Sequence, residues 1–176
     1  MMNETITTIL NRKSVREFAD KQVDSAFVEV ILRSAMSAPS ARNRQPWKFV
    51  VVDDNELKVA LADELPYAKM LKTASLGIVV CGDIRDKDDA TAQTFWQHDC
   101  AAAIENILLA CESLGLGAVW TACYPKQDRA DVVSKHLELP DGVVPMAVIP
   151  IGYPLQDTPV VDKWKEDNII YNKWKN

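Results

Sequence analysis

Uninterrupted apolar runs divide the chain into segments that we expect to be buried strands. The first, residues 47–53, reads WKFVVVD and is bounded by residues that favour turns. A short apolar run between turn signals is typical of a strand covered on both faces. Asp53 and Glu56 then have the spacing of a capping box for a following helix. The same pattern predicts three more strands, at residues 76–83, 118–124 and 146–152.

Helical spacing appears near the N-terminus, in residues 4–11 and again in residues 24–37. In the second segment, Phe27 and Ile31 fall on one face behind Asp24, a residue type that caps helix N-termini. Strands and helices therefore alternate along the chain.

The most apolar helix candidate covers residues 95–114. Gly115 and Gly117 follow it and supply a C-terminal stop. A helix that is apolar on more than one side must be covered on more than one side. Two explanations fit: a second subunit provides the extra cover, or the segment is the central core helix of a monomer. Its apolar stripe comprises Ile104, Ile107, Leu108, Cys111 and Leu114.

The composition is that of a single domain. A chain of 176 residues, 48% hydrophobic, holds enough apolar material for one core, so we expect one domain over residues 1–176. No apolar run approaches the roughly 18 residues of a membrane span, and the N-terminus lacks the layout of a signal peptide. We expect a cytoplasmic protein without membrane contacts. The net charge of −5 disfavours nucleic acid as a partner.

The cysteines are scattered and form no CxxC pair. This distribution argues against a zinc site and against a disulfide framework, and it fits buried thiols in a reducing compartment. We therefore expect no metal. The four positions are Cys81, Cys100, Cys111 and Cys123.

The segment from Arg12 to Arg16, RKSVR, has the donor groups of an anion site. In a helical turn Arg12 and Arg16 share a face, whereas in a strand residues 12, 14 and 16 share one. Either geometry brings two guanidinium groups and the Ser14 hydroxyl to one point, as a phosphate monoester requires. The alternative is a set of solvated surface charges.

A second polar segment, residues 38–47, reads APSARNRQPW and ends directly in a predicted strand. Its two prolines make the loop stiff. Ser40, Asn43 and Gln45 offer hydroxyl and amide groups that can read the edge of a heterocycle. Stiff loops beside a strand are suitable places for a ligand.

His98 and Asp99 are adjacent at the start of the predicted central helix and resemble a catalytic couple. Adjacent helical residues point in different directions, however. We expect Asp99 to favour the positive end of the helix and His98 to be partly exposed.

Taken together, these segments resemble the nitroreductase family. RKSVREF followed by APSARNRQPWKFVVV is similar to its two N-terminal signatures. HDCAAAIENILLACESLGLG resembles its long central helix, AVWTACYP its flavin-facing strand, and GYP with KWKEDNIIYNKW its C-terminal tail. The resemblance implies an α+β fold of three α/β/α layers around a mostly antiparallel sheet. It also implies an interlocked homodimer with FMN at the subunit interface and a tail, about residues 155–176, over the partner subunit.

Carried over position by position, the resemblance implies that the segment from Arg12 to Arg16 binds FMN. Arg12 would contact the phosphate, and Lys13 and Ser14 the phosphate, ribityl chain or ring edge. Arg16 would lie at the N1/O2 side of the ring, where a cation stabilises the reduced flavin. The chemistry takes place at flavin N5, so we expect no catalytic side chain.

The resemblance assigns three further groups of residues, with one departure from the family. The groups are Trp120, Thr121 and Ala122 along the isoalloxazine, Pro39, Ser40, Ala41 and Asn43 from the partner subunit, and Lys163 or Lys165 at the phosphate. Where the family often has two serines, this chain has Ser40-Ala41, so one hydroxyl is missing.

The implied activity is that of an FMN-dependent oxidoreductase. It would take hydride from NADH or NADPH and reduce a small acceptor such as a nitroaromatic or a quinone. The chain has no GxGxxG fingerprint, so the sequence does not choose between the two donors. The alternatives are specialised family chemistry, dehalogenation or flavin fragmentation, and a non-catalytic FMN-binding module.

Overall fold

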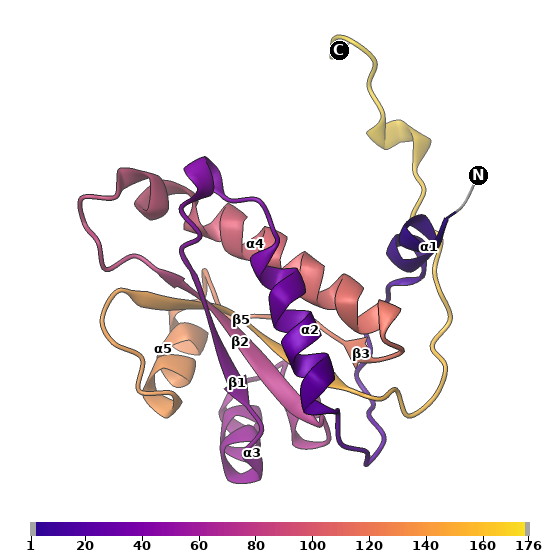
Figure 1. The fold of residues 1–176 in the computed structure, drawn as a ribbon, viewed down its shortest axis with the longest axis horizontal. Coiled ribbons are helices and arrows are strands. Elements are labelled where there is room, and N and C mark those ends of the chain that lie inside the picture. The colour runs from indigo at the N-terminus through magenta and orange to yellow at the C-terminus, as the bar shows by residue number, and fades with distance from the viewer. Residues whose placement is uncertain (1–2, 175–176) are drawn as a thin grey trace.

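The computed structural model describes residues 3–174, and its strands form one sheet (Figure 1). The strand order is β1-β2-β5-β3, β4 also pairs with β5, and every one of these pairings is antiparallel. The mostly antiparallel sheet is thus confirmed. The strands are β1 (Trp47–Val52), β2 (Leu76–Asp83), β3 (Gly117–Ala118), β4 (Thr121–Ala122) and β5 (Val143–Gly152).

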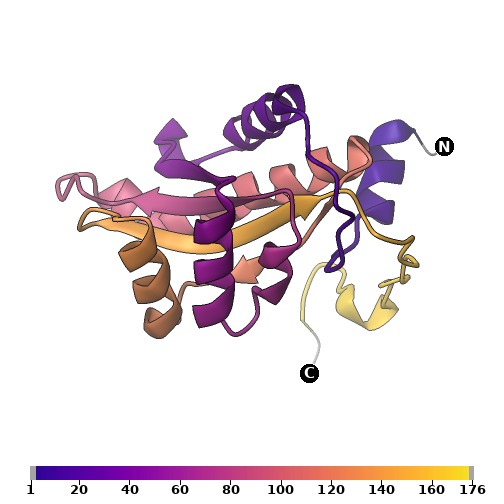
Figure 2. The ribbon, with the colours of Figure 1, turned by 90° about the horizontal axis from the view of Figure 1, so that it is seen from below.

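Helices cover both faces of this sheet, which gives the expected three layers. Figure 2 shows α2 and α4 on one face and α3 and α5 on the other. Within residues 3–174, no helix is long and apolar enough to cross a membrane. The helices are α1 (Glu4–Asn11), α2 (Ser25–Met36), α3 (Asn55–Glu64), α4 (Ala90–Ser113) and α5 (Gln127–His136), with short 3-10 turns at Ala41–Asn43, Lys69–Lys72 and Glu166–Asn168.

The central strands are buried on both faces, which explains their uninterrupted apolar sequences. In β2, Ile78 and Val80 belong to the core shared with α2 and α4. Val79 and Cys81 belong to the opposite core, shared with α3 and α5. Side chains alternate between the faces of a strand, so a strand with two covered faces needs apolar residues at every position.

The strand expected over residues 118–124 is instead two short strands, β3 and β4, interrupted at Val119 and Trp120. Both keep one register against β5, which places Val119 opposite Pro150. The carbonyl groups of Met146 and Val148 accept hydrogen bonds from Cys123 and Thr121. Every second residue of β5 thus directs its backbone polar groups toward β3 and β4, and Pro150 is the next residue in this series. Proline has no N–H to donate, and the ladder is broken there. β5 also begins three residues earlier than expected.

The central helix α4 begins at Ala90, five residues before the expected start. The Asp89 carboxylate caps it by accepting hydrogen bonds from the N–H groups of residues 91 and 92. Its C-terminal end is as predicted: Gly115 has φ +70°, and the Leu116 N–H donates to the Cys111 carbonyl at 2.8 Å. These contacts form the Schellman arrangement that favours glycine.

Of the two other predicted helix caps, that of α2 is confirmed and that of α3 is wrong by one residue. Asp24 caps α2 as expected, by accepting from the Ala26 N–H. The cap of α3 is Asp54 rather than Asp53, since its carboxylate accepts from the Leu57 N–H at 2.8 Å. The expected capping box was therefore one residue out of register.

Candidate functional site

The segment from Arg12 to Arg16 is extended, the second of the two geometries considered above. Helix α1 ends at Asn11, and Ser14 then forms a parallel bridge with Ala118 of β3. The Val15 N–H donates to the Ala118 carbonyl at 3.0 Å. The segment therefore runs along the outer edge of β3.

Arg12 and Lys13 lie against the C-terminal half of α4. The Arg12 Nε is 3.5 Å from the Glu105 carboxylate, and the Lys13 Nζ is 3.4 Å from that of Glu112. The Glu105 side chain is 50% exposed. An ion pair this close to water contributes little stability, so a more highly charged anion can displace the carboxylate.

Arg16 lines a pocket of about 460 Å³ together with Trp120, Thr121 and Ala122. Thus the predicted ring-edge cation and the predicted ring wall meet in one cavity, whose size is typical of small-molecule sites. Among residues 3–174, Arg16 has no ion pair and no side-chain hydrogen bond, so its charge is available to a ligand.

Some polar groups of this wall are already engaged. The Thr121 Oγ1 donates to the Val148 carbonyl at 2.6 Å, and the Cys123 N–H donates to the Met146 carbonyl at 3.0 Å. Trp120 is half-buried and Ala122 is exposed. The wall therefore presents an indole, a methyl group and backbone, rather than the Thr121 hydroxyl.

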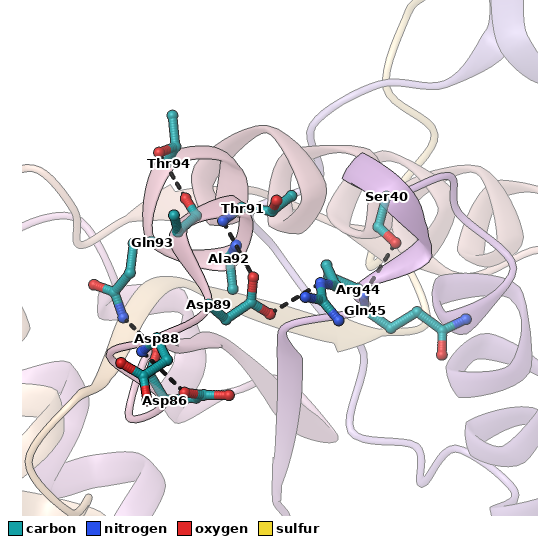
Figure 3. Close-up of polar contacts among 11 residues, drawn as sticks. Ser40, Arg44, Gln45, Asp86, Asp88, Asp89, Thr91, Ala92, Gln93 and Thr94 are labelled. Atoms are coloured by element: carbon teal, nitrogen blue, oxygen red, sulfur yellow. Dashed lines mark hydrogen bonds and ion pairs between the residues drawn. The ribbon is translucent and has the colours of Figure 1, made fainter.

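The loop that begins at Pro39 is fixed to the N-terminal half of α4. The Ala41 N–H donates to Asp99 Oδ1 at 2.9 Å. The Arg44 Nε lies 3.1 Å from the carboxylate of Asp89, the residue that caps α4 (Figure 3). Two anchors on one helix thus hold the loop, whose exposed members include Pro39 and Asn43.

The same loop has a strained backbone. Arg42, Asn43 and Gln45 have φ values of 51°, 55° and 51°, a left-handed region that residues with a Cβ seldom adopt. The Ser40 Oγ accepts from the Gln45 N–H at 3.0 Å and closes the loop (Figure 3). Strain of this kind is often found at ligand sites.

The expected position of Asp99 was wrong. Because α4 begins at Ala90, Asp99 lies in its third turn rather than at its positive end. It is only 4% exposed, and its Oδ2 has no hydrogen-bond partner. Its Oδ1 accepts the hydrogen bond from the Ala41 N–H. The adjacent His98 is exposed.

The two groups of predicted residues contact different parts of α4. Asp99 precedes Glu105 by six residues and Glu112 by thirteen, which corresponds to about 9 Å and 20 Å along the axis. Both glutamates are also rotated from Asp99 by about 120–140° around the helix. Within one chain, the Ala41 loop and the Arg12 segment therefore occupy separate places.

Lys163 and Lys165 lie on the C-terminal tail, which leaves the three-layer body (Figure 1). From residue 155 to 174 no residue is buried. Large apolar side chains on it face solvent, including Trp164, Tyr171 and Trp174 at 72%, 80% and 77% exposure. The two last residues of the predicted tail, 175 and 176, lie outside the described range.

Sequence reasoning missed part of the pocket around Arg16. Tyr67, Lys69 and Met70 come from the connection between α3 and β2, and Arg129 comes from α5. The connection has no regular period, and Arg129 reads as a solvated residue on the polar face of a short helix. No signal in the sequence singled them out.

The cysteines are free and buried, as predicted. Burial raises the pKa of Cys81, Cys100 and Cys111 to about 12 and that of Cys123 to about 11. In the described part of the chain, no group of three or more His, Cys, Asp or Glu residues is placed to hold a metal ion.

Comparisons with known proteins agree with this architecture. The family model described as "Nitroreductase family" matches residues 9–67 and 61–153. A relative from Archaeoglobus fulgidus is 38% identical over 176 residues, covering 98% of this chain and 100% of that protein. A crystal structure from Bacteroides thetaiotaomicron has 45% identity and a TM-score of 0.93, over 99% of this chain and 100% of that one. Both carry the provisional name NADH dehydrogenase/NAD(P)H nitroreductase.

A more distant solved structure is the FMN-dependent nitroreductase of Clostridium difficile. It is 26% identical, with a TM-score of 0.87 over 96% of this chain and 99% of that chain. The family match, the relatives and the three-layer fold all agree with the motifs in the sequence. The chain therefore belongs to the nitroreductase family and is an NAD(P)H-dependent oxidoreductase.

Proposed function

We propose that this protein is an FMN-dependent reductase of small acceptors such as nitroaromatics and quinones, and that it works as a homodimer. The observation that carries this proposal is the pocket in which Arg16, which has no ion pair within residues 3–174, meets Trp120 and Ala122. FMN, when bound, supplies the hydride chemistry at its N5 atom. The similarity to the FMN-dependent nitroreductase of Clostridium difficile supports the same cofactor here.

The donor groups present in the chain fit FMN. One extended segment carries Arg12, Lys13 and Ser14 at one end and Arg16 at the other, so it can serve an elongated ligand with an anionic end and a polar ring. Guanidinium groups match phosphate oxygens and keep their charge at all working pH values. We assign the phosphate to Arg12 with Lys13 and Ser14, and add Lys163 or Lys165 from the tail.

Arg16 and the wall beside it would carry the electrostatic part of catalysis. A fixed cation at the ring edge stabilises negative charge that develops there on reduction. The Cys123 N–H is bonded to Met146, and the N–H of Thr121, two residues earlier on the strand paired with β5, points the same way. We therefore assign the backbone donor to the ring to Trp120 or Ala122. The indole of Trp120 would also exclude water from this wall.

The homodimer follows from apolar surface that this chain leaves uncovered. Helix α1 has no buried residue, and Ile6, Ile9 and Leu10 on it are each more than 40% exposed. The tail adds the exposed side chains of Trp164, Tyr171 and Trp174, and apolar side chains exposed in such number favour an interface with another chain. We propose one domain per chain, with the tail over the second copy and the loop Pro39, Ser40, Ala41 and Asn43 reaching the partner's flavin.

The experiment is a purification followed by cofactor analysis. A yellow protein should release FMN on denaturation, and its light-scattering mass should be twice the chain mass of 19.7 kDa. NADH and NADPH oxidation should accelerate when a nitroaromatic or a quinone is added. A protein that binds no FMN on reconstitution, or a yellow monomer, would contradict the proposal.

A further inference from the structure

The pocket around Arg16 is more cationic than the flavin ring requires. Arg16, Lys69 and Arg129 line it, and no carboxylate of the described residues does, although the protein has a net charge of −5. Like charges gathered in one cavity raise the local concentration of the opposite charge. A second anionic group is therefore expected beyond the ring edge assigned to Arg16.

Arg129 is a second cation of this pocket with unused hydrogen-bonding capacity. Its Nη1 donates to the Ala122 carbonyl at 3.2 Å, and its Nε is buried without a partner. A guanidinium has five N–H donors in a fixed fork. Within residues 3–174 Arg129 pairs with no carboxylate. No side-chain hydrogen bond engages its Nη2 among these residues, so the Nη2 donors are available to an incoming anion.

Tyr67 places an aromatic surface beside this fork. The Arg129 guanidinium lies 4.8 Å from the centre of the Tyr67 ring, which is a favourable cation–π distance. Tyr67 is nevertheless 67% exposed, so much of its surface is free to contact a second ring. Lys69 reaches only the Asp63 carbonyl, at 3.4 Å, and its charge also remains available.

An aromatic surface next to an unsatisfied guanidinium fork suits a planar aromatic molecule with a carboxylate. We propose that Arg129 and Tyr67 form a subsite for an anionic aromatic electron acceptor, with Lys69 adding charge. This inference rests on the proposed function, because the acceptor must reach a reduced flavin in the same pocket. It adds that carboxylated acceptors are preferred over neutral ones of the same shape.

The test compares para-nitrobenzoate with para-nitrobenzamide, which differ in charge but little in shape. In the wild-type holoenzyme the ratio of their kcat/KM values should favour the benzoate. Arg129→Gln should lower this ratio about tenfold or more, and Arg129→Lys should lower it less, because lysine keeps the charge and loses the fork. Arg33→Gln, which removes an exposed arginine of α2, is the matched control and should leave the ratio unchanged.

Binding provides a readout that is independent of turnover. Benzoate titrated into the oxidised holoenzyme should perturb the flavin spectrum at lower concentration than benzamide does, and this difference should shrink in Arg129→Gln. If Arg129→Gln does not fold, the wild-type comparison and Arg129→Lys still decide the matter.

The outcomes separate the two proposals. An FMN-loaded enzyme that oxidises NAD(P)H but treats benzoate and benzamide alike would overturn the subsite and leave the proposed function intact. A variant in which only the ratio of NADPH to NADH use changes would also overturn it, because the anion would then belong to the dinucleotide. Absence of FMN and of turnover would instead refute the proposed function.

Discussion

Arg12→Ala tests the phosphate assignment most directly. The Arg12 side chain is 18% exposed, and its partner in the structure is the half-exposed carboxylate of Glu105 at 3.5 Å. A near-surface pair of this kind contributes less than about 1 kcal/mol to stability. A charge-assisted hydrogen bond to phosphate contributes about 1.5–3 kcal/mol. At about 1.4 kcal/mol per factor of ten, FMN affinity should fall roughly tenfold to a hundredfold.

The assay is a fluorescence titration of the apoprotein with FMN and, in parallel, with riboflavin, which lacks the phosphate. Arg12→Ala should weaken FMN binding and leave riboflavin binding nearly unchanged. Glu105→Gln is the matched variant: it removes the carboxylate that competes with the phosphate, so FMN should bind at least as tightly as to wild type. A folded Arg12→Ala protein that loses FMN and riboflavin affinity equally, or loses neither, would show that Arg12 does not bind the phosphate.

Arg16, Asp99 and the buried cysteines can each be tested separately. Arg16→Gln should lower the flavin midpoint potential in a redox titration, because the ring edge becomes more negative only on reduction; an unchanged potential would transfer this role to Lys13. Asp99→Ala should lower the free energy of unfolding in urea by about 1–3 kcal/mol by leaving the Ala41 N–H without an acceptor, whereas Asp99→Asn, which keeps an acceptor oxygen, should lose less; equal losses would argue against this hydrogen bond. A thiol reagent at pH 8 should label the folded protein slowly and all four cysteines after unfolding, because burial raises their pKa to about 11 or 12; a fast-reacting thiol in the native protein would contradict this.

Local patterns predicted both of the first two strands, but their burial differs. β2 is covered on two faces and needs apolar residues at nearly every position. β1 was recognised from the same apolar pattern, although it is an edge strand in which Lys48 and Val51 are exposed. The break between β3 and β4 was missed because it depends on Pro150, a residue of the neighbouring strand. The start of α4 was missed because its first turn is polar and its position depends on the Asp89 cap rather than on apolar spacing.

In the candidate site, too, local sequence patterns missed the features that depend on residues distant along the chain. The Arg16 segment and the Trp120 wall were predicted because each has a recognisable motif, and Arg16 and Trp120 line the same pocket. Arg129 was not found, since its unsatisfied Nε results from tertiary packing that no local pattern records. Asp99 was misplaced because the start of α4 was misplaced, and its hydrogen bond was missed because Ala41 is 58 residues away along the chain.

The left-handed residues of the Ala41 loop have a thermodynamic consequence. Ordering a flexible residue on binding costs about 1–2 kcal/mol of conformational entropy. Here Arg42, Asn43 and Gln45 already hold their unusual geometry, because Asp99 and Asp89 fix the loop when the chain folds. The Ala41 loop is therefore ordered when the chain folds, and a ligand that contacts it encounters a rigid template. The tail is hydrogen-bonded to Glu17 at Leu155 and Gln156, but residues 157–174 have no hydrogen bond to the three-layer body. The entropic cost of ordering these residues would therefore weaken assembly of the dimer.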